Sequence, residues 1–387
     1  MCAGWPRTAR HVREILPNAT GRSVTPSANS QLKQALEALV LPDIGHRLGE
    51  VARVRRAEQA GPEVEVDIEL GYPADSQLAA YAELVAAAAR AAAGGAEPRV
   101  TIECRVTSHG VQRNLKPLAN VRNIVAVASG KGGVGKSTTA ANLALALHAE
   151  GGRVGVLDAD IYGPSQPLMF GLTGQRPSSA DGKTMDPLTA YGVQVMSIGF
   201  LIDADQPMVW RGPMVTSALI QLLQQTRWDD LDYLVVDMPP GTGDIQLTLS
   251  QQVPVSGAVI VTTPQDIALL DARKGLQMFR KVGVPVLGIV ENMSTHICSN
   301  CGHEEPIFGT GGGSRMASEY GVELLGQLPL DVGIREQTDS GRPTVIAAPD
   351  SPQAGIYRRT ARRMAARLAS QGKDYSHRFP KIVVEES

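Results

Sequence analysis

The chain has 387 residues, of which 43% are hydrophobic and 20% are charged, and this balance excludes a wholly disordered or collagen-like protein. No apolar run approaches the roughly 18–20 residues that a membrane-spanning helix needs. The net charge of −2 gives no overall attraction to nucleic acid or anionic lipid, and four cysteines are too few for a disulfide scaffold. We therefore expect a cytoplasmic protein that binds neither membranes nor nucleic acid.

In the first third of the chain, we predict a leader followed by a small α+β domain. Residues 1–30 contain several prolines and arginines without a periodic apolar face, and we interpret them as a disordered leader, with an organelle transit peptide as the alternative. Within residues 31–108, positions 64–70 alternate between apolar and acidic side chains, which is typical of a half-buried strand. An alanine-rich helix over 78–93 precedes a second strand, whose apolar face includes Cys104 as an expected core residue.

The remainder of the chain predicts a larger α/β domain. Residues 109–122 are a mixed polar linker, residues 123–372 alternate short apolar runs with helical stretches, and residues 373–387 are an exposed tail. Uncharged runs of about five residues between helices are typical of parallel strands buried on both faces. We expect a doubly wound, mostly parallel sheet. Its predicted strands cover residues 124–128, 154–157, 193–198, 233–236, 258–261 and 286–290.

A glycine-rich loop follows the first of these strands and precedes a helix, and it matches the phosphate-binding pattern G-x-x-x-x-G-K-S. Glycines allow consecutive backbone N–H groups to surround a phosphate, and the following helix adds the positive end of its dipole. Lys136 supplies a charge to the terminal phosphates, and the Ser137 hydroxyl can bind Mg²⁺. The residues predicted to bind ATP here are Gly130, Lys131, Gly132, Gly133, Val134, Gly135, Lys136, Ser137 and Thr138.

Polar residues at the ends of other strands complete the predicted ATP site, because carboxyl ends of parallel strands face the ligand crevice. Asp160 is positioned to activate the attacking water, and Asp158 to support the metal shell. Asp237 fits the carboxylate that holds Mg²⁺ through water, and Gly241 can offer its N–H to the γ-phosphate. Asn292 carries an amide that can read an adenine edge, although a turn asparagine is the alternative.

Two cysteines separated by two residues, Cys298 and Cys301, follow the last predicted strand. Two thiolates can bind one metal ion or one edge of a cluster. A zinc ribbon would need two more ligands, and His303 supplies only one; a redox dithiol normally lies at a helix start rather than before a glycine-rich loop. Half a site suggests that a second chain provides the other half, so that four thiolates hold one cluster.

The combination of motifs resembles the Mrp/ApbC iron–sulfur cluster carriers. The motifs are S-G-K-G-G-V-G-K-S-T, L-D-A-D-I-Y-G-P-S, V-W-R-G-P-M at 209–214, D-M-P-P-G-T-G-D, V-E-N-M-S and C-x-x-C. The resemblance implies a homodimeric ATPase that binds a [4Fe–4S] cluster and passes it to apoproteins. Lys131 is similar to the lysine that marks the MinD/ParA class of phosphate loop and reaches the partner's nucleotide across a dimer; a solvated surface lysine is the alternative.

Some features depart from this family or favour other functions. Where the family's small domain often has cysteine-proline, this chain has Gly71-Tyr72-Pro73, so we expect a docking or regulatory module rather than a metal site. The alternatives to a cluster carrier are a positioning ATPase acting on membrane or DNA, and a zinc-binding adaptor. A positioning ATPase needs a basic or membrane-binding surface; we interpret the arginines over residues 358–367 as a solvated helix face instead.

Overall fold

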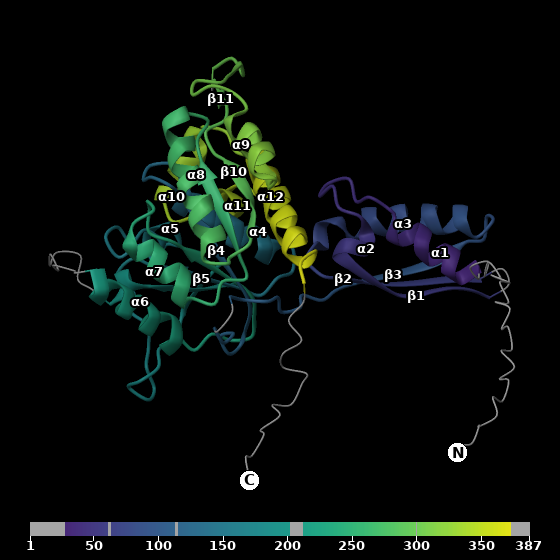
Figure 1. The fold of residues 1–387 in the computed structure, drawn as a ribbon, viewed down its shortest axis with the longest axis horizontal. Helices are drawn as coiled ribbons and strands as arrows, with labels where there is room; N and C mark the ends of the chain where they lie inside the picture. The colour runs from purple at the N-terminus through teal and green to yellow at the C-terminus, as the bar shows by residue number, and fades with distance from the viewer. Residues whose placement is uncertain (1–27, 61–62, 113–114, 202–211, 299, 373–387) are drawn as a thin grey trace, which may run out of the picture.

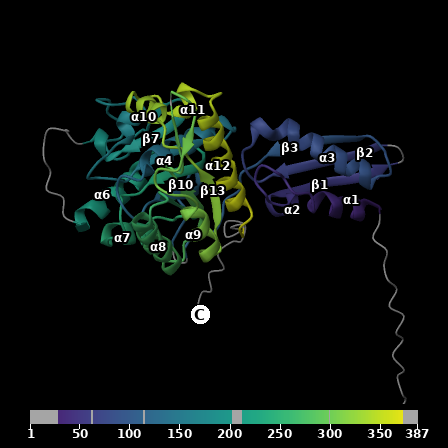
Figure 2. The ribbon, with the colours of Figure 1, turned by 90° about the horizontal axis from the view of Figure 1, so that it is seen from above.

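The computed structural model describes residues 28–60, 63–112, 115–201, 212–298 and 300–372. The predicted tail, most of the predicted leader, and the Val209–Arg211 part of one motif lie outside these ranges. The first helix begins at Ala28, inside the segment predicted as a leader. Figures 1 and 2 show a small N-terminal domain beside a larger domain, in two views related by a right angle.

The small domain is a three-stranded sheet with helices on one face (Figure 1). The central strand β2 is antiparallel to β1 and parallel to β3. Side chains of β2 alternate between buried and partly exposed positions, as the sequence predicts. Cys104 ends β3 half-buried against the core, so it is less enclosed than expected. The elements are α1 (Ala28–Glu37), α2 (Leu48–Val51), β1 (Ala52–Ala60), β2 (Glu63–Leu70), α3 (Leu78–Ala92) and β3 (Pro98–Cys104).

Within the described ranges, the large domain contains an eight-stranded sheet in the order β13-β10-β9-β4-β8-β5-β7-β6. All neighbouring strands are parallel except β6, which pairs antiparallel with β7. The prediction of a mostly parallel, doubly wound sheet is therefore confirmed, although the short edge strands β6 and β13 were not predicted. The strands are β4 (Val121–Ala128), β5 (Val154–Asp158), β6 (Leu188–Ala190), β7 (Val193–Ser197), β8 (Leu231–Asp237), β9 (Gly257–Thr262), β10 (Val286–Glu291) and β13 (Glu323–Gln327).

Helices cover both faces of this sheet: Figure 2 shows α4 and α12 on one side and α6, α7, α8 and α9 on the other. Among the described residues, no helix combines the length and the apolar character needed to cross a bilayer. The helices are α4 (Lys136–Ala149), α5 (Gln166–Met169), α6 (Gly212–Gln225), α7 (Asp244–Gln252), α8 (Asp266–Lys281), α9 (Gly312–Tyr320), α10 (Val332–Asp339), α11 (Thr344–Ala347) and α12 (Pro352–Ala369).

Buried charges join the two domains. Arg362 of α12 donates to Glu150, the residue that caps the carboxyl end of α4, at 2.6 Å, and to Asp43 of the small domain at 2.9 Å. Glu150 also accepts hydrogen bonds from the backbone N–H and hydroxyl of Ser76. Tyr81 donates to Asp43 and is itself bonded to Tyr72. Because Glu150 is fully buried and Arg362 nearly so, this junction network holds the domains in one arrangement.

The expectation of a solvated arginine face on the last helix is therefore wrong for its central residues. Arg362 is only 6% exposed, and Arg363 donates to the backbone oxygen of Asp43 at 3.0 Å. Arg367 is half-buried and pairs with Glu323. The physical reason is tertiary: α12 lies against both domains, so groups distant in sequence bind these arginines, carboxylates at Arg362 and Arg367 and a backbone oxygen at Arg363.

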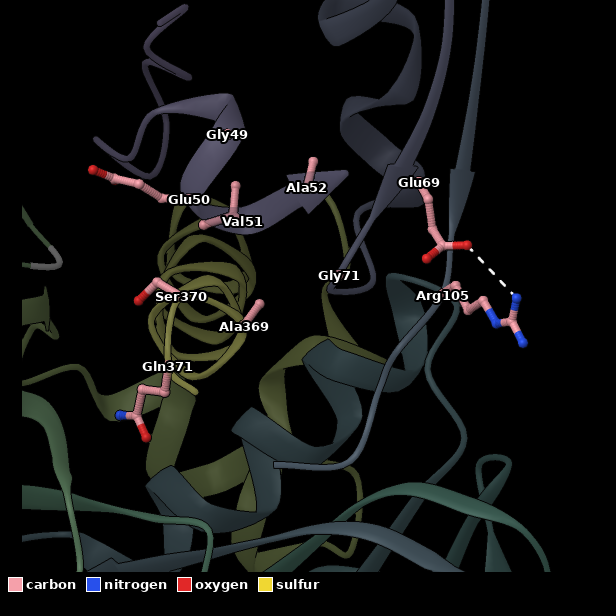
Figure 3. A pocket seen from close by; sticks show the side chains of 10 residues that line it. All are labelled: Gly49, Glu50, Val51, Ala52, Glu69, Gly71, Arg105, Ala369, Ser370 and Gln371. Atoms are coloured by element: carbon pink, nitrogen blue, oxygen red, sulfur yellow. Dashed lines mark ion pairs between the residues drawn. The ribbon is translucent and has the colours of Figure 1, made fainter. Parts of the chain in front are cut away.

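Gly71, at the start of the segment where the resemblance would place cysteine-proline, lies at the same junction. A Cβ atom at Gly71 would come within 3.2 Å of the Ala369 Cβ and within 2.9 Å of the Val51 oxygen. Figure 3 shows Gly71 facing Ala369 beside a cavity of 140 Å³. The close approach of β2 to α12 therefore requires a residue without a side chain here.

Candidate functional site

The glycine-rich loop connects β4 to α4 at the carboxyl edge of the sheet. Gly133 and Gly135 have φ of +81° and +78°, a left-handed conformation that favours glycine. A Cβ atom at Gly130 would lie 2.1 Å from the carbonyl carbon of Asp271 in α8. The glycines of the motif thus satisfy backbone conformation at two positions and helix packing at a third.

Lys136 and Asp237 form an ion pair at the centre of this edge, where Lys136 is 6% exposed and Asp237 fully buried. The Lys136 Nζ atom also lies 3.0 Å from the Ser137 hydroxyl. The other carboxylate oxygen of Asp237 accepts a hydrogen bond from the Gln166 side chain at 2.8 Å. The structure therefore brings together the lysine, the hydroxyl and the carboxylate that the sequence assigns to phosphate and Mg²⁺ binding.

Asp158 lies next to this group at the end of β5, fully buried. Its carboxylate accepts hydrogen bonds from the Gln166 N–H at 3.0 Å, the Ser197 hydroxyl at 3.1 Å and the Asp160 N–H at 3.2 Å. Burial, followed by the neighbouring charge of Asp237, raises the pKa of Asp158. A second carboxylate beside Asp237 thus favours a cation at this position.

Asp160 faces a more open space than Asp158. It is partly exposed, and burial raises the pKa of its carboxyl group. It lines a cavity of 410 Å³ together with Tyr162, the two prolines that follow β8, and residues 243–246 at the start of α7. A carboxylate at the edge of such a cavity can contact a water molecule, which agrees with the role that the sequence suggests.

The remaining predicted ATP residues surround the loop in different ways. Asn292 donates from its side-chain amide to the Val134 oxygen at 2.9 Å, so in this conformation it braces the phosphate loop. The Gly241 N–H donates to the Ser129 oxygen at 3.0 Å. Lys131 is partly exposed, and no carboxylate of the described chain pairs with it. Roles in adenine reading, γ-phosphate contact and action across a dimer remain predictions.

Sequence reasoning missed Gln166, the first residue of α5. It is fully buried, and its amide nitrogen donates both to Asp237 and to the Ser137 backbone oxygen, the latter at 3.2 Å. Its place six residues after D-A-D was the available signal. That position alone does not distinguish a buried glutamine from an exposed one, whereas the fold places its amide against Asp237.

The two predicted thiols lie on a short hairpin, β11 (His296–Ile297) and β12 (Glu304–Glu305), which extends from the top of the large domain in Figure 1. Cys301 is exposed and Cys298 partly exposed. The backbone N–H groups of Asn300 and Cys301, together with the Cys301 thiol, lower the pKa of Cys298. This arrangement favours a thiolate that can bind a metal.

The hairpin does not complete a metal site alone. In the described ranges, which omit Ser299, no group of three or more histidine, cysteine, aspartate or glutamate side chains is arranged to hold a metal ion. The thiolate pair suits the soft ligand requirements of iron–sulfur clusters or zinc, whereas the hydroxyl and carboxylates at the phosphate loop suit Mg²⁺. The two candidate sites therefore have distinct ligand chemistries.

Two family models match this chain. Residues 120–365 match the ParA family model described as "NUBPL iron-transfer P-loop NTPase", and residues 29–102 match the model "Iron-sulfur cluster assembly protein". A Pseudomonas fragi protein named "Iron-sulfur cluster carrier protein" is 66% identical over 69% of this chain and 94% of its own length. A Haemophilus influenzae protein of the same name is 48% identical over 90% of this chain and 95% of its own.

A solved structure supports the same assignment. The nucleotide-binding protein from Archaeoglobus fulgidus, in complex with ADP, is 38% identical with a TM-score of 0.54, over 61% of this chain and 91% of that protein. The family match covers the phosphate loop, the strand-end carboxylates and the thiol hairpin together. The chain belongs to the ParA-type family of NUBPL iron-transfer P-loop NTPases.

Proposed function

We propose that this protein hydrolyses ATP with Mg²⁺ and carries a [4Fe–4S] cluster between two copies of the chain for delivery to apoproteins. One observation carries the proposal: each chain has an enclosed set of phosphate- and cation-binding side chains, but only two thiols on its exposed hairpin. A nucleotide-binding loop in each chain and half a cluster site are what a dimeric carrier driven by ATP requires.

The residues around Lys136 support ATP and Mg²⁺ binding. The Ser137 hydroxyl and Asp237 would hold Mg²⁺, Asp237 through water, with Asp158 supporting them. Bound Mg²⁺ supplies positive charge that neutralises the phosphates. Lys136 would exchange its ion pair with Asp237 for the terminal phosphates, and the N–H groups of the loop would bind the remaining oxygens.

Hydrolysis would depend on residues at the rim of this site. Asp160 is positioned to orient or deprotonate water from the adjoining cavity. The Gly241 N–H would leave the Ser129 oxygen to contact the γ-phosphate. Lys131, which has no carboxylate partner in the described chain, would reach the nucleotide of a second copy, so that turnover requires a closed dimer.

The iron–sulfur cluster would bind at the hairpin. Cys298 and Cys301 of each chain would supply two of the four thiolates that a [4Fe–4S] cluster needs. The exposure of the hairpin suits a cluster that must leave for another protein. Apoproteins that accept a [4Fe–4S] cluster are therefore the proposed clients.

Anaerobic reconstitution with iron and sulfide tests this proposal. We expect one [4Fe–4S] cluster per two chains by iron analysis and Mössbauer spectra, and transfer to an apoenzyme whose activity depends on such a cluster. Repeating the measurements with and without ATP tests the coupling. Stoichiometric zinc in protein purified without oxygen would instead indicate an adaptor, and pelleting with liposomes or DNA would indicate a positioning ATPase.

A further inference from the structure

The cluster of polar side chains at the phosphate loop includes an amide whose oxygen has no partner. Gln166 is fully buried, and its Oε1 atom has no hydrogen-bond donor among the residues that the structure describes. Its Nε2 atom donates to Asp237 and to the Ser137 backbone oxygen. This orientation of the amide is required, because both of those partners are acceptors only.

A buried amide oxygen without a donor is unusual in a folded protein and needs an explanation. The neighbours of Gln166 give one. Its side chain contacts Asp237 and the backbone of Ser137, while its backbone N–H donates to Asp158. Gln166 therefore contacts all three residues that the proposed function assigns to Mg²⁺, although it carries no charge itself.

We infer that Gln166 is a positioning residue for the Mg²⁺ of the bound nucleotide, and that its free side-chain oxygen accepts a hydrogen bond from a metal-bound water. The inference rests on the proposed function, because it assumes Mg²⁺·nucleotide at this edge of the sheet. It adds a residue outside the phosphate loop and the strand-end carboxylates, contributed by the short helix α5.

The hydrogen bonds of Asp237 explain how Gln166 would act. One carboxylate oxygen is paired with Lys136 and the other is held by Gln166. When Lys136 turns to the phosphates, it releases only the Asp237 oxygen with which it was paired. Gln166 still holds the other oxygen and keeps the carboxylate in a fixed orientation. Residues that orient metal ligands in this way typically change metal affinity by about 10–100-fold when they are replaced.

The test separates metal binding from nucleotide binding. Fluorescent mant-ADP is titrated into the full-length protein in EDTA and then at increasing Mg²⁺ concentrations. We expect Gln166→Met, which keeps the volume and removes the amide, to bind mant-ADP in EDTA within about twofold of the wild type. The Mg²⁺ concentration that gives half of the Mg²⁺-dependent change should rise by about 10–100-fold.

Gln337→Met is the matched control. Gln337 lies on α10, outside the phosphate-loop edge, and its Oε1 atom, like that of Gln166, has no hydrogen-bond donor within the described chain. This variant should leave the half-saturating Mg²⁺ concentration unchanged. If Gln166→Met does not fold, Gln166→Asn carries the same test, because it keeps the amide but withdraws it by one methylene.

The outcomes distinguish the inference from the proposed function. An unchanged Mg²⁺ requirement in a folded Gln166 variant, with a normal wild type, would overturn the inference alone. A wild-type chain that binds no mant-ADP, or binds it without any effect of Mg²⁺, would overturn the proposed nucleotide site as well. An equal rise in the Gln337→Met control would also count against a specific role for Gln166.

Discussion

The phosphate-loop edge and the thiol hairpin are built in opposite ways. At the edge, Asp237 is buried and bonded to the side chains of both Lys136 and Gln166, which come from two other segments and are also buried. On the hairpin, Cys301 and His303 are exposed on a loop between two-residue strands. Hydrogen bonds to Leu330 tie the base of the hairpin to the domain.

This difference separates a set of side chains that is enclosed within one chain from a thiol pair that one chain leaves exposed. A buried charge network keeps its geometry before any ligand arrives, and this is the preorganisation that phosphate chemistry needs. An exposed thiolate pair has few internal contacts, so a second chain or a client can approach it. The following predictions test whether the two regions are as independent as this comparison implies.

The largest effect should come from the hairpin. Cys298→Ala or Cys301→Ala should reduce bound iron to background after anaerobic reconstitution, because one remaining thiolate cannot hold half of a cluster. ATP turnover should stay within about twofold of wild type, since most variants away from a site change little. Cys104→Ala is the matched control, because that thiol is half-buried in the small domain. Full iron content in either hairpin variant would rule out the bridging cluster.

At the other site, Lys136→Ala should reduce ATP turnover on the order of 10²–10³-fold, because no other side chain in the loop can supply this charge. The substitution also leaves Asp237 buried without its cation. Phosphate release is the measurement, and Lys33→Ala, an exposed lysine of α1, is the control. Wild-type turnover in the purified variant would refute the phosphate-loop assignment.

Lys131→Ala should give a smaller and different loss. We expect nucleotide binding to survive while hydrolysis falls about 10–100-fold, because the lost contact forms only in the closed dimer. Mixing this variant with Lys136→Ala chains should restore part of the activity, since one active site of each mixed dimer then has both lysines. No recovery, with mixed dimers confirmed, would show that Lys131 does not act across the interface.

The smallest effect concerns thiol reactivity. Because hydrogen bonds lower the pKa of Cys298, its alkylation should reach half-maximal rate below the ordinary pKa of 9.0. Burial raises the pKa of Cys104, so its alkylation should require higher pH. Iodoacetamide pulses followed by peptide mass spectrometry measure both, with Cys301→Ser separating the two hairpin thiols. Equal profiles for Cys298 and Cys104 would contradict the difference in environment.

The parts of this molecule that depend on local sequence were predictable. The phosphate loop needs glycines at fixed spacing between a strand and a helix, and the apolar runs of the sheet are continuous because both faces are covered. The edge strand β13, Glu323–Gln327, has two polar ends and a glycine, so it lacks that pattern. The packing of the linker could not be predicted either, because the Gln112 side chain donates to the backbone oxygens of Ser250 and Val253, which are far away in sequence.

Residues whose roles depend on distant partners were missed or misread. Arg362 looks like one member of a solvated arginine run, and only the fold brings Asp43 and Glu150 to it. The role of Gln166 was missed for the same reason, because its hydrogen-bond partners come from two other segments of the chain. Spacing patterns describe residues that are close in sequence. The roles of Arg362 and Gln166 depend on residues that are close only in the folded structure.

The junction network has a consequence for how this protein can be divided. Separating the small domain from the rest would leave Arg362 without Asp43 and Glu150 without Ser76, so an excised NTPase domain would carry a damaged surface rather than a natural one. Arg362 would keep its pair with Glu150 but lose its second carboxylate, and Glu150 would lose both hydrogen bonds from Ser76. Because Glu150 ends the helix that begins at Lys136, that damage lies at the far end of the phosphate-binding helix. In this chain, removal of the small domain should therefore disturb the NTPase domain at the carboxyl end of α4.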